Sequence, residues 1–84
     1  MSNTFADMVE RMKDVISLEV GGKVYDKNVA FALGIEPAVM ANMKCRGRIP
    51  YDAVTGFCIE KRVSVNWILF GIGPMEMKDA AKSL

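Results

Sequence analysis

The stretch from Asp26 to Cys45 constrains the fold most, because it predicts two short helices joined by a tight turn. Gly34 ends the first helix, since glycine tolerates the positive φ that such a turn demands. Pro37 begins the second, since the fixed φ of proline suits the first position of a helix. Ala30 is small where the helices approach, so they can cross at a steep angle. The side chains expected in the core behind the turn are Val29, Leu33, Ile35, Met40 and Met43.

An amphipathic helix is predicted before this pair, with Asn3 or Thr4 as its N-cap. Its apolar residues recur every three or four positions, at Phe5, Met8, Val9, Met12, Val15 and Ile16. The segment 17–26 contains Gly21 and Gly22, which interrupt the helical period, and we expect a connecting loop there rather than a short hairpin.

Asp26 is expected to cap the N-terminus of the next helix, which should run from about Lys27 to Leu33. Tyr25, just before the cap, is expected to pack onto Ala30 as a hydrophobic staple.

Two more helices are expected after Gly47, which should end the second helix of the pair near Cys45. Pro50 begins the fourth helix, and Ser64 caps a fifth, in which Trp67 should contribute the largest buried area. The residues expected to face inward are Val54, Phe57, Cys58, Ile59 and the stem of Lys61 on the fourth helix, and Val65, Ile68 and Leu69 on the fifth.

The sequence therefore predicts an all-α, compact five-helix domain over residues 1–74, with residues 75–84 as a tail or the start of a linker. The chain has 84 residues, of which 51% are hydrophobic and 25% charged. This balance is typical of one globular domain.

Positive charge is concentrated in the middle of the chain. The net charge is +1, but residues 23–62 carry +3, residues 1–22 carry −2 and residues 63–84 carry none. Lys44, Arg46 and Arg48 cluster where the third helix is expected to end. A charge run of this kind is usually a solvated helix C-terminus, but its place beside the helix pair favours contact with an anionic partner.

Several functional classes lack their characteristic residues. Cys45 and Cys58 form no CxxC pair, and the chain has no histidine, so neither a zinc site nor a Cys/His nucleophile is expected. Cys45 is expected to be a free surface thiol and Cys58 a core residue. We find no paired-carboxylate motif and no phosphate-binding glycine loop, so we expect no enzyme, no catalytic residue, no metal, no cofactor and no small-molecule substrate.

No membrane segment is expected either. The most apolar stretch, residues 63–73, has about half the length that a bilayer span requires. The N-terminal segment carries charges where a signal peptide would be apolar, which indicates an intracellular protein.

Four motifs follow one another after residue 32: Leu33-Gly34-Ile35, Arg46-Gly47-Arg48-Ile49-Pro50-Tyr51, Val65-Asn66-Trp67-Ile68-Leu69 and Gly71-Ile72-Gly73-Pro74. In this order and spacing they resemble the DNA-binding domain of bacteriophage CI-type repressors, a lambda-repressor-like helix-turn-helix fold. The resemblance implies a transcriptional repressor in the cytoplasm of a bacterial host, bound to double-stranded operator DNA as a homodimer. Longer members of that family carry a C-terminal dimerisation and self-cleavage domain, so the chain is expected to be either an N-terminal fragment or a short stand-alone regulator.

The third helix would then be the recognition helix in the major groove. The spacing places six residues on its outer, base-facing side: Glu36, Pro37, Ala38, Ala41, Asn42 and Cys45. The residues expected to contact phosphates are Lys23, Lys27, Asn28, Lys44, Arg46, Arg48 and Tyr51.

The start of the recognition helix departs from the family, which usually has Ser or Thr there, followed by polar residues. Glu36 repels phosphate unless it accepts a hydrogen bond from a cytosine amino group, and Asn42 can bond adenine or a phosphate. Ala38 and Ala41 can contact thymine methyl groups, or can simply be helix-forming surface residues. Base-specific contacts are therefore expected to be few.

The low net charge and the apolar outer face of this helix also suit a different function. A small helical protein-interaction module, such as an adaptor or an anti-repressor, would present the same residues to a protein partner.

Overall fold

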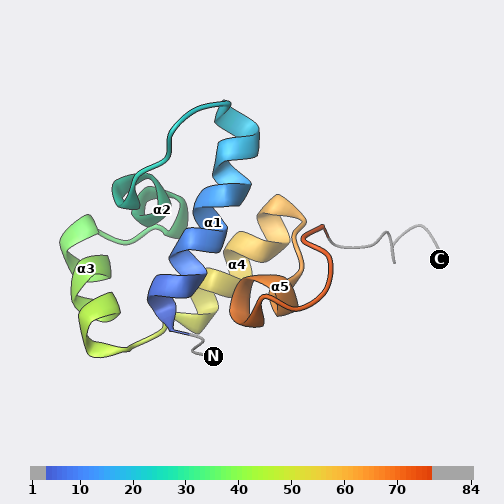
Figure 1. Cartoon of the computed structure of the whole chain (residues 1–84). Helices are drawn as coiled ribbons and strands as arrows, with labels where there is room; N and C mark the ends of the chain where they lie inside the picture. Colours follow the sequence, from blue (N-terminus) through green and yellow to red (C-terminus); the bar gives the residue numbers. More distant parts are fainter. Residues whose placement is uncertain (1–3, 77–84) are drawn as a thin grey trace.

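The computed structural model describes residues 4–76, which form five helices in an all-α arrangement (Figure 1). The helices are α1 (Phe5–Val20), α2 (Asp26–Leu33), α3 (Pro37–Arg46), α4 (Tyr51–Lys61) and α5 (Val65–Phe70). The predicted helix order and the all-α class are therefore confirmed.

The N-terminus of α1 is fixed by a reciprocal capping box. The Asp7 N–H donates to Thr4 Oγ1 at 3.1 Å, and the Thr4 N–H donates to Asp7 Oδ2 at 3.2 Å. The helix continues to Val20 and ends at Gly21, which has φ 69°. The prediction that the loop begins at Ser17 was therefore wrong, because no helix-breaking residue precedes Gly21.

The start of α2 also differs from the prediction. Tyr25 is the N-cap and Asp26 is already helical, while Asn28 Oδ1 accepts the Tyr25 N–H at 2.8 Å. Tyr25 is 51% exposed, so it does not form a staple on Ala30. Asp26 does not cap the helix because its carboxylate lies between the ammonium groups of Lys13 and Lys44.

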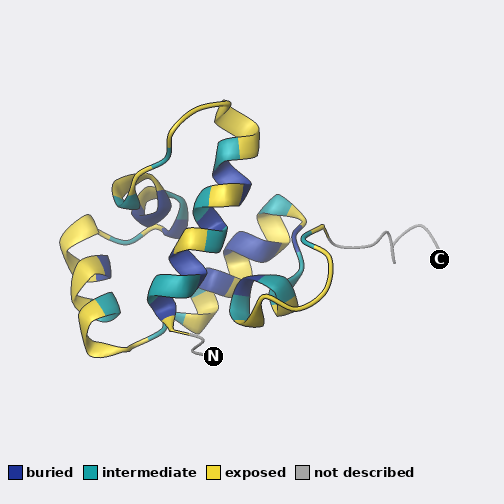
Figure 2. Cartoon of the chain, in the orientation of Figure 1, coloured by how far each residue is buried: buried dark blue, intermediate teal, exposed yellow. Residues whose placement is uncertain are grey.

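The core lies around α1, which packs against α2, α3 and α5 (Figure 2). All six apolar residues predicted for the buried face of α1 are buried. From the other helices and the α4–α5 link, the core includes Val29, Ala30, Leu33, Met40, Val54, Phe57, Cys58, Val63 and Ile68.

Two residues of the last helices lie elsewhere than predicted. Ile59 is 67% exposed, because the helical period turns it away from the stripe of Phe57 and Cys58. Trp67 is only partly buried, and Ile68 is the fully buried residue of α5. Ser64 caps α5 as predicted, with its Oγ accepting the Trp67 N–H at 3.2 Å.

The end of the described chain returns to the core. Met75 is partly buried, its carbonyl accepts the Ser64 N–H at 2.8 Å, and Val63 forms a β-bridge with Glu76. The rest of the predicted tail, residues 77–84, lies outside the described residues.

A contact that the sequence did not indicate joins α1 to the end of α5. Arg11 Nη1 donates to the carbonyl of Ile68 at 2.7 Å. A cation at a helix C-terminus satisfies a carbonyl that has no partner within the helix.

Two phenylalanines with opposite environments test this description of the core. Phe57→Ala should lower the free energy of unfolding by roughly 3–5 kcal/mol, because it leaves a cavity in a closely packed interior. Phe31 is 87% exposed, and Phe31→Ala should change the free energy by less than about 0.5 kcal/mol. Urea unfolding followed by circular dichroism measures both. Equal effects of the two substitutions would contradict the assigned core.

Candidate nucleic-acid interface

The turn between α2 and α3 is built from backbone hydrogen bonds around one glycine. Gly34 has φ 74°, and its N–H donates to the Phe31 carbonyl at 3.1 Å. The next N–H, of Ile35, donates to the Ala30 carbonyl at 3.0 Å. Pro37 is the first residue of α3, as predicted. The chain thus leaves α2 and enters α3 within three residues, which fixes the two helices close to each other.

The outer side of α3 is open to solvent. All six residues predicted to face DNA are exposed, namely Glu36, Pro37, Ala38, Ala41, Asn42 and Cys45. Since successive helical residues are about 100° apart, Ala38, Asn42 and Cys45 lie opposite the buried Met40, and Ala41 lies beside them. Val39, which the sequence analysis did not select, is 44% exposed on the flank.

Two arginines follow directly on this surface. Arg46 is the last residue of α3, and Arg48 lies just after Gly47, which has φ 70°. Both arginines are exposed, and neither forms an ion pair with another described residue. Tyr51, 58% exposed, starts the following helix. Cationic groups are therefore free beyond the C-terminal end of the exposed helix.

Other predicted phosphate contacts lie at and before the start of α2. Lys23, Lys27 and Asn28 are exposed, and the Lys23 Nζ lies 5.5 Å from the centroid of the Tyr25 ring. Asn28 uses its side-chain oxygen to accept the Tyr25 N–H, which leaves the side-chain NH₂ as its remaining polar group. The donors thus flank the exposed helix in two separate groups.

Lys44 has a different environment from the other predicted phosphate contacts. Its Nζ lies 2.6 Å from Asp26 Oδ2, and the Lys13 Nζ lies 2.7 Å from Asp26 Oδ1. The hydrogen bonds from Lys13 and then Lys44 lower the pKa of the Asp26 carboxyl, and the contact with Asp26 raises the pKa of Lys13. The sequence did not indicate this cluster, because its three residues are far apart in the chain.

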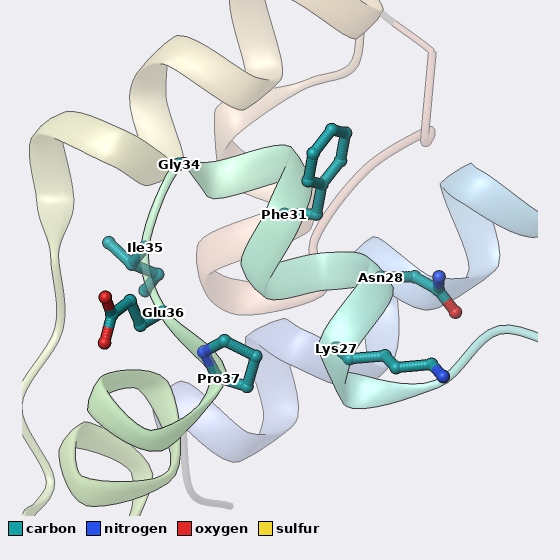
Figure 3. A pocket seen from close by; sticks show the side chains of 7 residues that line it. All are labelled: Lys27, Asn28, Phe31, Gly34, Ile35, Glu36 and Pro37. Carbon is teal, nitrogen blue, oxygen red and sulfur yellow. The ribbon is translucent and has the colours of Figure 1, made fainter.

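A pocket of about 600 Å³ lies beside the turn, between α2 and the start of α3 (Figure 3). Its lining residues are Lys27, Asn28, Phe31, Gly34, Ile35, Glu36 and Pro37. Phe31 was not selected from the sequence, although an aromatic residue outside the predicted buried stripe of α2 was a usable signal.

The structure places the two cysteines as predicted. Cys45 is an exposed free thiol, and Cys58 is a buried one whose pKa is raised by burial. Among the described residues, no group of three or more Cys, Asp or Glu side chains is arranged to hold a metal ion. None of the described helices combines the length and the apolar character of a membrane span.

Comparisons with protein-family models, with curated proteins and with solved structures found no match to this chain.

Two glycine substitutions test the geometry of the turn. Gly34→Ala should lower the free energy of unfolding by about 1–2 kcal/mol, because alanine is strained at φ 74°. Gly56 lies within α4 with open space around its Cα, so Gly56→Ala should raise the free energy by roughly 0.5–1 kcal/mol. Thermal unfolding of both variants measures the difference. A stabilising effect at Gly34 would show that the turn has another conformation.

Proposed function

We propose that this domain binds double-stranded DNA sequence-specifically and serves as the DNA-binding part of a phage-type transcriptional repressor. The observation that carries the proposal is the exposed outer side of α3, followed directly by Arg46 and Arg48 without ion-pair partners in the described chain. The four motifs that resemble phage CI-type repressors support the same function. A repressor of this class acts in the cytoplasm of a bacterial host.

In this proposal α3 lies in the major groove, which is wide enough for one helix. Arg46 and Arg48 contact the phosphates at its C-terminal end and release counterions. Lys27 and Asn28, at the start of α2, contact phosphates on the other side of the groove. These contacts place the protein on the duplex but carry no sequence information.

Sequence is then read by few groups. Ala38 and Ala41 contact thymine methyl groups, Asn42 bonds to adenine, and Glu36 accepts from a cytosine amino group. One small module covers little DNA, so we further propose a homodimer on a two-fold symmetric operator, with half-sites about one helical turn apart.

Charge reversal tests the phosphate contacts. Arg46→Glu with Arg48→Glu should weaken DNA binding about a hundredfold or more near 0.1 M salt, because two contacts are replaced by repulsion. The single variant Arg48→Glu should show part of this loss. Fluorescence anisotropy with a duplex selected by the wild-type protein from a random library measures the affinity.

Arg62→Glu is the matched control for Arg48→Glu. Arg62 is exposed and unpaired within the described residues, and it lies at the opposite end of α4 from Arg48. The Arg62→Glu substitution changes the net charge as much as Arg48→Glu does, and it should have little effect on DNA affinity.

Full DNA binding by the double variant Arg46→Glu with Arg48→Glu contradicts the phosphate assignment. Absence of DNA binding by the wild type at low salt favours a protein-interaction module instead, with the exposed Phe31 as a contact.

Base substitution tests the methyl contacts separately. Replacing thymine by uracil in the selected duplex should weaken binding about fourfold for each methyl group that Ala38 or Ala41 contacts, since each loses one apolar contact. An Ala41→Gly variant should discriminate less between the two duplexes. If the thymine and uracil duplexes bind equally, the two alanines are only helix-forming surface residues, while DNA binding itself is untouched.

A further inference from the structure

We propose that Asp26 is a positioning residue that sets the orientation of α3, and with it the fit of the recognition surface to the groove. This inference rests on the proposed DNA-binding function. It assigns the Asp26 carboxylate, which lies between lysines of α1 and α3, a role in specificity although it contacts no DNA.

One carboxylate joins three helices. Asp26 is the first residue of α2, and its two oxygens hold different partners: Oδ1 lies 2.7 Å from Lys13 Nζ of α1, and Oδ2 lies 2.6 Å from Lys44 Nζ of α3. Lys13 is also paired with Glu10, at 3.2 Å. The lysine side chains are only 23% and 24% exposed, so their stems are held by packing as well.

The rest of α3 is weakly anchored. Met40 is its one buried residue, and Met43 is partly buried. Both methionines lie before the last turn of α3, whose other residues Cys45 and Arg46 are exposed and add no apolar contact. Lys44 lies on the same side of α3 as Met40, one turn further on, so its bond to Asp26 supplies a second fixed point near the C-terminal end of α3. Two points define the direction of the helix axis.

Electrostatics alone and positioning of α3 predict opposite effects on DNA affinity when this carboxylate is lost. Asp26 is an acid close to a surface that we propose to bind phosphates, and its removal would free Lys44 and leave Lys13 paired with Glu10. If charge alone mattered, an Asp26→Asn variant would bind every DNA more tightly. If Asp26 positions α3, the variant loses affinity for its preferred sequence only.

The experiment compares Asp26→Asn with Glu19→Gln in the complete 84-residue chain. Glu19 is a matched control, because it pairs with Lys61 at 2.8 Å, with side-chain exposure of 49% against 46% for Asp26, and joins α1 to α4. Each variant loses one negative charge, so the two net charges change equally. The probes are the duplex selected by the wild type and a scrambled duplex of equal length and composition.

Asp26→Asn should lower the ratio of selected to scrambled affinity about fivefold, with scrambled DNA bound as well as before or better. Glu19→Gln should keep the ratio within about twofold. An unchanged ratio in Asp26→Asn overturns the proposal, as does an equal loss in Glu19→Gln, which would indicate general loosening of the domain.

Lys44→Met distinguishes positioning from direct phosphate contact. If Lys44 is a positioning residue, the substitution leaves the slope of log affinity against log salt unchanged and lowers the ratio of selected to scrambled affinity. If Lys44 contacts a phosphate, the substitution makes the slope less steep by about 0.9 and weakens binding to both duplexes alike. The second result would overturn the assignment of Lys44 to Asp26.

Residual dipolar couplings of the free protein test the inference without DNA. The couplings of α3 relative to α1 should change in Asp26→Asn and stay the same in Glu19→Gln. Changed couplings in a protein whose wild type shows no sequence preference would retain the positioning role and reject the proposed function. Unchanged couplings in Asp26→Asn would reject the positioning role.

Discussion

The burial of one side of α1 is the interaction on which the remaining helices depend. Its six buried side chains face α2, α3 and α5, so the consecutive helices α2 and α3 and the more distant α5 share one apolar surface. Phe5, Val9 and Met12 are almost completely removed from water, and this burial is the main stabilising contribution available to so short a chain. The capping box at Thr4 sets the start of this helix at the edge of the core, and the left-handed Gly21 ends it about one turn beyond Ile16, the last buried residue.

The arrangement separates the core from the surface that we propose to bind DNA. The core is filled mainly from α1, α2 and α4, whereas α3 and α5 contribute one buried residue each, Met40 and Ile68. The outer side of α3 is therefore free to vary without loss of core packing. Because α3 has so few buried side chains, its orientation depends on polar contacts, among which the Lys44–Asp26 pair is the shortest.

Features that act through a residue's own backbone were predictable from the sequence. Gly34 and Gly47 adopt the expected positive φ, Pro37 begins α3, and Ser64 caps α5, because these preferences are local. The exposure of the outer side of α3 follows from the same helical period. The contact between Arg11 and Ile68 was not predictable, because its partners are 57 residues apart. The prediction that Asp26 caps α2 was wrong for the same reason. Its carboxylate pairs instead with two lysines that only the tertiary fold brings near.

The two thiols of the chain differ in a way that makes one of them a built-in reporter. Cys45 is exposed on the outer side of α3, while Cys58 is buried and its pKa is raised. An exposed cysteine attacks alkylating reagents through its thiolate, whereas a sequestered thiol does not react. A single dye can therefore be attached to native Cys45 without removing any cysteine, and its signal reports directly on whether this side of the helix is occupied.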